Sequence, residues 1–382
     1  MTRMAPKSKG FSTSKPQQRM AVIGGGIMGA MTAAHLVEQG VSVTVYDPNP
    51  MGTGPGASVD TGRSFRVHYG EDQALIQMAA RSRNLWMGWE QKLGRPLLHT
   101  TGKLLIEEPG DRHALDSWRT LRGLGLRADR MSQGAVLEEW PGLHTGAATV
   151  DRLGGVLDPV VILQGLHVWL ASNGVEFRGE ALEVSSDSVD CAGTKTEFDR
   201  VILTAGAWTQ RWVDVTMEVT RQELVYFDAS ALGDRLRRLP VFSHMESGFY
   251  AIPTVKDGRI KVANHHPGVL GHPDGDARRV SADFEKEARQ FLGRYIPELA
   301  EADVARRYVC FYSGTADRDF ILDRTPDGLV VGAGFSGHGF KFAPLIGRVL
   351  AQLALGLDPE VDLERFSMRR PALRGERTKL AV

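Results

Sequence analysis

The chain has 382 residues, enough for two domains or one large discontinuous domain. Its 46 Lys and Arg residues balance its 46 Asp and Glu residues, so no overall basic field points to nucleic acid as a partner. Two cysteines, Cys191 and Cys310, exclude a disulfide framework and fit a reducing, cytoplasmic environment. No apolar stretch approaches the roughly 18–20 residues of a membrane span, so no membrane partner is predicted.

Both ends of the chain are predicted to lie outside the folded body. Residues 1–19 are basic and rich in Ser and Pro, but they lack the apolar core of a secretory signal. We expect them to form a disordered extension, with a targeting segment as the alternative. Residues 371–382 are expected to form a C-terminal tail.

Residues 20–47 predict a complete dinucleotide-binding unit and read MAVIGGGIMGAMTAAHLVEQGVSVTVYD. A short apolar strand precedes glycines in G-x-G-x-x-G spacing, then a helix that stops at Gly40 and a second strand that ends on Asp47. A dinucleotide-binding motif requires this order of elements: a strand, a glycine turn, a helix, and a second strand that ends on an acidic residue. The motif does not separate FAD from NAD. Asp47 would accept a hydrogen bond from a ribose hydroxyl, and its charge disfavours NADP.

Each glycine of this motif has a distinct predicted role. Gly24 allows the tight turn, Gly26 lets a pyrophosphate approach the backbone, and Gly29 lets the helix pack closely on the strand. The phosphates would lie against the start of the helix at Ile27 and Met28, where free N–H groups and the helix dipole favour anions.

Residues 56–71, GASVDTGRSFRVHYGE, follow the second strand and carry Arg63 and Arg66. Two neighbouring arginines usually lie on a solvent-exposed face. However, a loop at this place in a nucleotide-binding domain lies over the cofactor. From the residues alone, two interpretations are equally open. Both arginines are exposed to solvent, or one of them binds an anion such as a substrate carboxylate.

Residues 249–266 predict two alternating strands around the turn Lys-Asp-Gly. Lys261 and His265 are four apart on the second strand, and a period of two places them on one face of the sheet. Such a pair can form a cationic site for an anion or for oxygen chemistry. An exposed strand face with ordinary charges is the alternative.

Residues 327–356 predict a second strand, a glycine-rich loop and a helix from about Pro344. The loop carries His338 and Lys341, and its helix N-terminus favours a negative group. Its glycines favour close approach of the backbone to a flat ligand and stand at Gly332, Gly334, Gly337 and Gly339.

These units recur along the chain and are interrupted by strand-rich blocks, so a mixed α/β fold is predicted. A Rossmann-type domain is expected to be interleaved with a β-rich substrate domain. The expected segments are 20–96, 147–212 and 308–370 for the nucleotide domain, and 97–146 and 213–307 for the substrate domain.

After residue 19 the chain resembles the FAD-dependent amine oxidases of the D-amino-acid-oxidase superfamily, of the type of monomeric sarcosine oxidase and N-methyltryptophan oxidase. The motifs that carry the resemblance are GGGIMG, GASVDTGRSFRVHYGE, the Lys261–His265 strand, Cys310-Phe311-Tyr312 and AGFSGHGFKF at 333–342. The last of these is the most specific.

The resemblance implies where the cofactor is held. Cys310 matches the cysteine joined by a thioether to the 8α-methyl of the flavin, and nearby cations are expected to favour its thiolate. Without the resemblance, Cys310 would be read as an inert buried thiol. Arg63 matches a basic residue close to the flavin. The remaining cofactor residues would be Gly24, Gly26, Ile27, Met28, Gly29 and Asp47 for the ADP moiety, and Gly334, Gly337, Gly339, Phe340 and Lys341 for the flavin edge.

The resemblance also implies the catalytic residues. Lys261 matches the lysine that activates oxygen over flavin N5 through a water, and Arg66 and Lys341 match the pair that holds the substrate carboxylate, with Glu71 as a supporting acid. The residues that match the lining of the substrate cavity are His265, Tyr250 and Tyr312.

The sequence departs from sarcosine oxidase at three cavity positions. Gly62 stands where that family has threonine, Val59 where it has histidine, and Asn264 where it has tyrosine. These differences alter the cavity, so the natural substrate need not be sarcosine.

The predicted enzyme is a monomer that oxidises a secondary amino acid, N-methylated or cyclic, and passes the electrons from FAD to molecular oxygen, giving hydrogen peroxide. No metal site is predicted. The alternatives are an oxidase of another amine, such as a D-amino acid, glycine, a cyclic imino acid or a glycated amino acid, and a flavin dehydrogenase with a different acceptor. A nicotinamide dehydrogenase is the least favoured, because nothing in the chain resembles a nicotinamide half-site.

Overall fold

The computed structural model describes residues 17–110, 112–275 and 278–374. Most of the predicted extension and most of the predicted tail therefore lie outside the described residues. Nowhere in the described ranges is there a helix both long enough and apolar enough to cross a membrane.

The first large sheet has six strands in the order β19-β20-β13-β1-β2-β9, with β1 in its interior. The pairs from β20 to β9 are parallel, and β19 joins β20 antiparallel. In that order the strands span Ile321–Arg324, Val330–Ala333, Arg200–Leu203, Arg19–Ile23, Ser42–Tyr46 and Glu176–Arg178. A parallel sheet assembled from distant segments confirms the predicted Rossmann-type, mixed α/β class.

Alternation along β1 divides the core into two layers. Met20 and Val22 belong to the apolar cluster that the helices share, whereas Ala21 and Ile23 belong to the cluster on the other face. The helices of the first layer are α1 (Ile27–Glu38), α2 (Gln73–Leu93), α5 (Pro159–Ser172) and α8 (Ala343–Leu355). The small sheet that packs on the other face consists of β10 (Glu183–Val184), β11 (Ser188–Cys191) and β12 (Thr194–Glu197).

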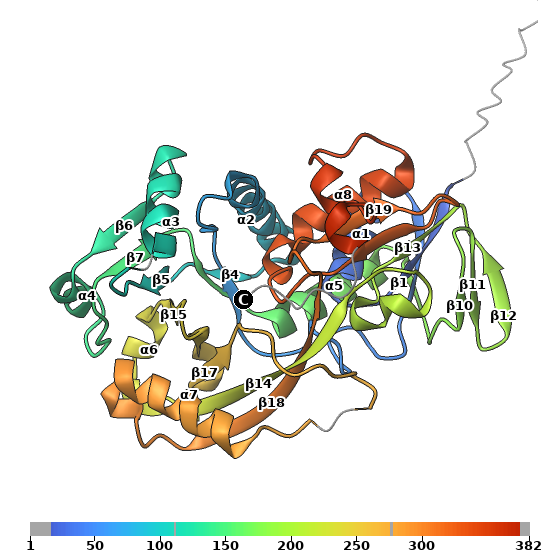
Figure 1. Cartoon of the computed structure of the whole chain (residues 1–382). Coiled ribbons are helices and arrows are strands. Elements are labelled where there is room, and N and C mark those ends of the chain that lie inside the picture. The colour runs from blue at the N-terminus through green and yellow to red at the C-terminus, as the bar shows by residue number, and fades with distance from the viewer. Residues whose placement is uncertain (1–16, 111, 276–277, 375–382) are drawn as a thin grey trace, which may run out of the picture.

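The second large sheet has eight strands in the order β18-β14-β17-β16-β15-β5-β7-β6. Its pairs are antiparallel except β15 with β5. In that order the strands span Val304–Gly314, Glu218–Asp228, Arg259–Asn264, Phe249–Thr254, Val241–His244, Lys103–Ile106, Ala148–Asp151 and Ala128–Met131. Helix α7 (Ala282–Tyr295) packs on β14, β16 and β17 of this sheet (Figure 1).

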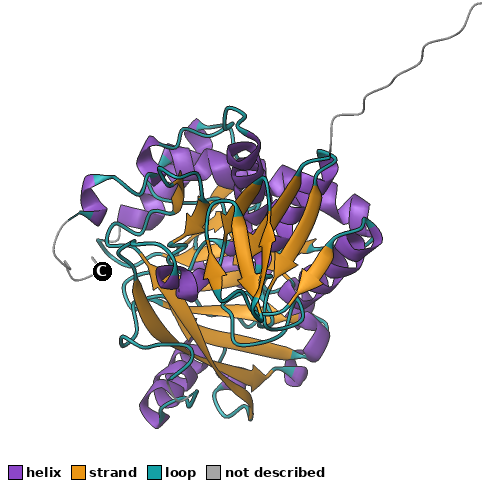
Figure 2. Ribbon diagram, turned by 90° about the vertical axis from the view of Figure 1, so that its right-hand side faces the viewer, coloured by secondary structure: helices purple, strands orange, loops and turns teal. Residues whose placement is uncertain are grey.

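Most helices gather over the six-stranded sheet (Figure 2). A short third sheet packs on β15 and β16 of the eight-stranded sheet through Val156. Its strands, in sheet order, are β3 (Arg63–Phe65), β8 (Gly155–Leu157) and β4 (Leu98–His99). The remaining helices are α3 (Arg112–Gly123), α4 (Gln133–Glu139), α6 (Arg235–Arg238) and the 3₁₀ turns η1 (Gly206–Arg211), η2 (Ser230–Leu232), η3 (Val255–Asp257), η4 (Pro297–Leu299), η5 (Phe340–Phe342), η6 (Glu364–Phe366) and η7 (Pro371–Leu373). The predicted domain boundaries stay a prediction.

Candidate active site

A cavity of about 1160 Å³ runs between the two large sheets, from the glycine turn after β1 to the ends of β17 and β18. This volume exceeds the roughly 300–1,000 Å³ of a typical small-molecule site. The cavity therefore has room for a cofactor together with a substrate.

The glycine turn of the predicted dinucleotide motif forms one end of the cavity. Gly24 has a φ of +101°, which favours glycine, and a side chain at Gly29 would place its Cβ 1.9 Å from the Gly24 carbonyl oxygen. Gly26 caps α1, so the first residues of that helix, Ile27 and Met28, line the cavity. A phosphate is expected at such a helix N-terminus.

Asp47 lies at the end of β2 and lines the cavity, as a ribose-binding acid must. Its two carboxylate oxygens already accept hydrogen bonds from the backbone amides of Gly25 and Asn49, both at 2.8 Å. Ser58, which sequence reasoning missed, accepts from the Ile27 amide at 3.0 Å and so ties the loop after β2 to the start of α1.

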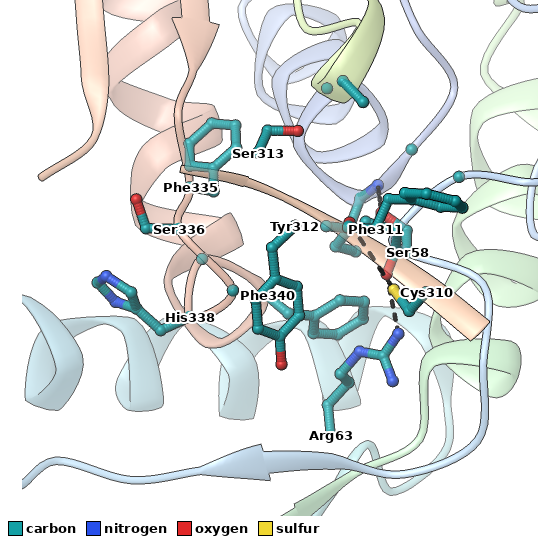
Figure 3. A pocket seen from close by; sticks show the side chains of 18 of the residues that line it. Ser58, Arg63, Cys310, Phe311, Tyr312, Ser313, Phe335, Ser336, His338 and Phe340 are labelled. Carbon is teal, nitrogen blue, oxygen red and sulfur yellow. Dashed lines mark hydrogen bonds between the residues drawn. The ribbon is translucent and has the colours of Figure 1, made fainter. Parts of the chain in front are cut away.

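Cys310 lies on β18 with its sulfur beside the guanidinium of Arg63 (Figure 3). Its side chain is buried. Burial raises the pKa of the Cys310 thiol, and the Arg63 charge, which lowers that pKa, is not sufficient to reverse the shift. The expected cation is present, but burial outweighs its effect on the thiol.

Lys261 lies on β17 and is 1% exposed. Its Nζ donates to Asp60 Oδ2 at 3.0 Å, to the Thr61 carbonyl at 3.0 Å and to the Gly62 carbonyl. Burial lowers the pKa of Lys261 to about 8, although the Asp60 charge opposes the shift.

The buried carboxylate of Asp60 connects three polar side chains and lies near a fourth, the partly exposed Arg306. It accepts hydrogen bonds from Lys261, from Arg63 at 2.8 Å and from the Tyr226 hydroxyl, and Arg306 lies 3.9 Å away. Tyr226 and Lys261 are direct partners across β14 and β17, so both side chains reach the same carboxylate. Burial raises the Asp60 pKa, but Lys261 and Arg63 outweigh it, so the pKa is lowered and the group is ionised.

Arg66 and Lys341 line another part of the cavity, joined through Tyr69. Arg66 donates to the His68 carbonyl at 2.7 Å, and its guanidinium lies 4.1 Å from the centre of the Tyr69 ring. Lys341 donates to the Tyr69 hydroxyl at 3.0 Å and to the His338 carbonyl at 2.7 Å. Burial, with the nearby charge of Arg66, holds the pKa of Lys341 well below its usual value.

His265 follows the last residue of β17 and lines the same cavity as Lys261. Arg318 Nη2 lies 2.9 Å from His265 Nε2. Because a guanidinium can only donate, His265 Nε2 is the acceptor and the ring is neutral. Burial and Arg318 lower the His265 pKa accordingly. The predicted lining residues Tyr250 and Tyr312 face the cavity here, with the Tyr312 ring 6.1 Å from that of His265.

The loop between β20 and α8 packs against the Tyr312 ring at Gly337. Gly334 and Gly337 have φ of +63° and +74°, and a Cβ at Gly337 would lie 2.3 Å from the Tyr312 ring. A Cβ at Gly339 would meet the Phe335 side chain at 2.6 Å, and Phe340 lines the cavity. The helix predicted from about Pro344 is confirmed as α8. Glu71, the expected supporting acid, is exposed and is not among the described lining residues.

Comparison with known proteins identifies the fold and the family. Residues 19–353 match the family described as FAD dependent oxidoreductase. The chain is 29% identical to monomeric sarcosine oxidase of Bacillus sp. (strain B-0618), over 94% of this chain and 98% of that protein. It is 23% identical to N-methyl-L-tryptophan oxidase of Salmonella agona, over 92% and 98% of the two chains. The structure of glycine oxidase from Geobacillus kaustophilus superimposes with a TM-score of 0.80 at 22% identity, over 93% of this chain and 99% of that one.

The chain belongs to the FAD-dependent oxidoreductase family. FAD is therefore its cofactor, and the chain is an oxidoreductase, as the resemblance implied. The residues present fit that group. The glycine turn and the first residues of α1 line the cavity and suit the pyrophosphate, and Gly337, Gly339 and Phe340 of the second glycine loop line it as well.

Sequence reasoning missed two charged residues of the site, Asp60 and Arg318. Asp60 stands in the quoted motif three residues before Arg63, so its spacing was visible, but its burial and its contact with Lys261 were not. Arg318 lies in a turn at a φ of 61°, between two aspartates that suggest an ordinary surface charge cluster.

Proposed function

We propose that this family member is an FAD-dependent oxidase of secondary amino acids, N-methylated or cyclic. The overall reaction converts the amine-bearing carbon to an imine, which water hydrolyses to a carbonyl compound and an amine, and it reduces oxygen to hydrogen peroxide. When bound, FAD supplies the redox chemistry, and the protein supplies orientation and electrostatics.

The observation that carries the proposal is the pairing of Arg66 with Lys341 on the cavity wall. Within the ranges 17–110, 112–275 and 278–374, neither cation forms an ion pair with a carboxylate of the protein, although Lys341 is 4% exposed. A buried cation without a counter-charge is costly and favours an anionic ligand. The names of the sarcosine and N-methyltryptophan oxidases at 23–29% identity support an amino acid as that ligand.

In this proposal Arg66 and Lys341 hold the substrate carboxylate by charge-assisted hydrogen bonds and so fix the position of the amine-bearing carbon. His265, Tyr250 and Tyr312 shape the space around it. His265 accepts the Arg318 hydrogen bond and therefore remains neutral.

Lys261 has the separate role of stabilising the negative charge that oxygen acquires as it is reduced. Its ammonium is held by Asp60 and two backbone carbonyls, so it is fixed before oxygen arrives. Cys310 is proposed to bind the flavin covalently, with Arg63 beside the sulfur to favour loss of the thiol proton. Two free cysteines and the monomeric relative support a monomer in a reducing, cytoplasmic compartment.

Anaerobic bleaching of the bound flavin tests the proposed substrate class. The panel contains sarcosine, N-methyl-tryptophan, proline, pipecolate, glycine and D-alanine, together with simple amines that lack a carboxylate. We expect bleaching by secondary amino acids only, followed by peroxide formation on admission of air. Bleaching by carboxylate-free amines would exclude the Arg66–Lys341 clamp, and bleaching without peroxide would favour a dehydrogenase.

Acid precipitation tests the covalent link. We expect the yellow colour to stay with the protein pellet in the wild type and to pass into the supernatant for Cys310→Ser. The matched control is Cys191→Ser, which changes the cysteine that packs behind the six-stranded sheet and should leave the colour in the pellet. Release of flavin from the wild type would show that attachment is not covalent.

A further inference from the structure

We call the part of the cavity lined by Arg66, Lys341 and His265 the substrate end. It carries more positive charge than one substrate carboxylate neutralises. Arg66, Lys341 and Arg318 all line it, and among the described residues none of the three is ion-paired to a carboxylate. The aspartates beside Arg318 in the sequence are taken by other arginines. Asp317 pairs with Arg370 at 2.6 Å and Asp319 pairs with Arg365 at 2.6 Å.

Arg318 is held in place by hydrogen bonds to the cavity wall. His338 Nε2 lies 3.1 Å from the Arg318 carbonyl and therefore donates to it, and His338 Nδ1 accepts from the Tyr69 hydroxyl at 3.3 Å. The same hydroxyl accepts from Lys341. A chain of hydrogen bonds thus connects Lys341 to the backbone of Arg318, so the two cations keep a fixed relation to each other.

The Arg318 side chain is directed into the site. One of its nitrogens donates to His265, which itself lines the substrate end. A guanidinium has five donors in a planar fork that matches a carboxylate, and the His265 contact leaves others for a ligand. Burial lowers the Arg318 pKa, as expected for a cation whose charge has no compensating anion nearby.

The phosphates of FAD do not account for this charge. They belong at the start of α1, where Ser58 contacts Ile27. Ser58 and His338, the partner of Arg318, lie on opposite sides of the view in Figure 3. Arg318 therefore faces the substrate end rather than the pyrophosphate.

We propose that the natural substrate is a secondary amino acid with a second carboxylate in its side chain, which Arg318 binds while Arg66 and Lys341 hold the α-carboxylate. The inference rests on the proposed function and specifies its substrate. The class comprises N-alkyl derivatives of aspartate, glutamate and similar dicarboxylic amino acids.

A binding measurement tests the second anion site without catalysis. The holoenzyme is titrated calorimetrically with succinate and with its monoamide, succinamate, which has the same shape and one charge fewer. We expect succinate to bind at least about tenfold more tightly, because the amide leaves the Arg318 donors without a charged acceptor. Equal affinities of the two ligands in the wild type would overturn the proposal.

Substitution of Arg318 assigns the preference to that residue. In Arg318→Gln the affinity ratio of the two ligands should fall to about one, and Arg318→Lys, which keeps a charge but not the fork, should retain part of it. The matched control is Arg324→Gln, an exposed arginine at the end of β19, which should keep the wild-type ratio. A ratio that is unchanged in Arg318→Gln would overturn the assignment.

Anaerobic flavin reduction then compares N-methyl-aspartate with N-methyl-asparagine, and N-methyl-glutamate with N-methyl-glutamine, each as both enantiomers. We expect at least one acid to reduce the flavin about tenfold or more faster per unit concentration than its amide, and this ratio to vanish in Arg318→Gln. Reduction by sarcosine without any acid-over-amide preference would refute the second carboxylate alone. Failure of every secondary amino acid would refute both this inference and the proposed function.

Discussion

Lys261 and Lys341 are both buried cations that line the cavity, but among the described residues only Lys261 contacts a carboxylate. Lys261 contacts Asp60, which Arg63 and Tyr226 also contact, so the protein itself supplies the counter-charge. Lys341 contacts only neutral partners that the structure describes, the Tyr69 hydroxyl and the His338 carbonyl.

The difference separates two uses of a buried charge. In the group around Asp60, one carboxylate contacts two cations, and this contact stabilises them whether or not a ligand is present. The group around Lys341 has donors without an anionic acceptor, and burial lowers the pKa of this lysine well below its usual value. Such a region is suited to a ligand that brings the missing negative charge.

Lys261→Met should have the largest effect on turnover. It removes the ammonium proposed to stabilise reduced oxygen, and removal of one such group typically slows the dependent step by about 10²–10³-fold. Stopped-flow mixing of the reduced enzyme with oxygen measures this step, and anaerobic reduction by substrate measures the other. Equal slowing of both half-reactions would contradict the assigned role of Lys261.

Lys341→Met should lower the second-order rate constant of flavin reduction by substrate about a hundredfold. Loss of one partner of a buried charge pair with the substrate costs about 2–5 kcal/mol. The free energy of unfolding of this variant should change by less than about 1.5 kcal/mol, since lost hydrogen bonds are offset by removal of an uncompensated charge. Lys195→Met, an exposed lysine on β12, is the matched control for both measurements. A large loss of stability would show that Lys341 is a structural cation like Lys261.

Asp60→Asn should lower the free energy of unfolding by about 3 kcal/mol, because it leaves Lys261 and Arg63 buried without their counter-charge. Asp129→Asn is the control. Asp129 pairs with Arg152 at 2.6 Å but its side chain is 50% exposed, so we expect a loss below about 1 kcal/mol. Urea unfolding of the two holoenzymes compares them, and equal losses would mean that the Asp60 group is no stronger than a surface ion pair.

The sequence predicts elements that depend on local contacts better than it predicts groups of charges from distant segments. The unit at 20–47 depends on contacts within a short stretch, and its predicted strands and helix correspond to β1, α1 and β2 within two residues. The charged groups depend on contacts between distant segments. Asp60 and Lys261 are 201 residues apart and Arg318 and His265 are 53 apart. The spacing of Lys261 and His265 and the family resemblance both identified Lys261 as a candidate. Asp60, the carboxylate that holds it, lies in the loop before β3, and only the tertiary fold brings that loop to β17.

The pH dependence of flavin reoxidation has the smallest expected effect, but it tests the pairing of Lys261 with Asp60 most specifically. The pKa of Lys261 is lowered to about 8, so its ammonium is present below that pH and is lost as the pH rises through it. Reoxidation should therefore slow about tenfold between roughly pH 7 and pH 9. The Asp60 charge raises the Lys261 pKa, so Asp60→Asn should move the midpoint to lower pH, and Lys261→Met should abolish the transition. A midpoint that does not move in Asp60→Asn would show that another group titrates, and the pairing of Lys261 with Asp60 would then have no part in the reaction with oxygen.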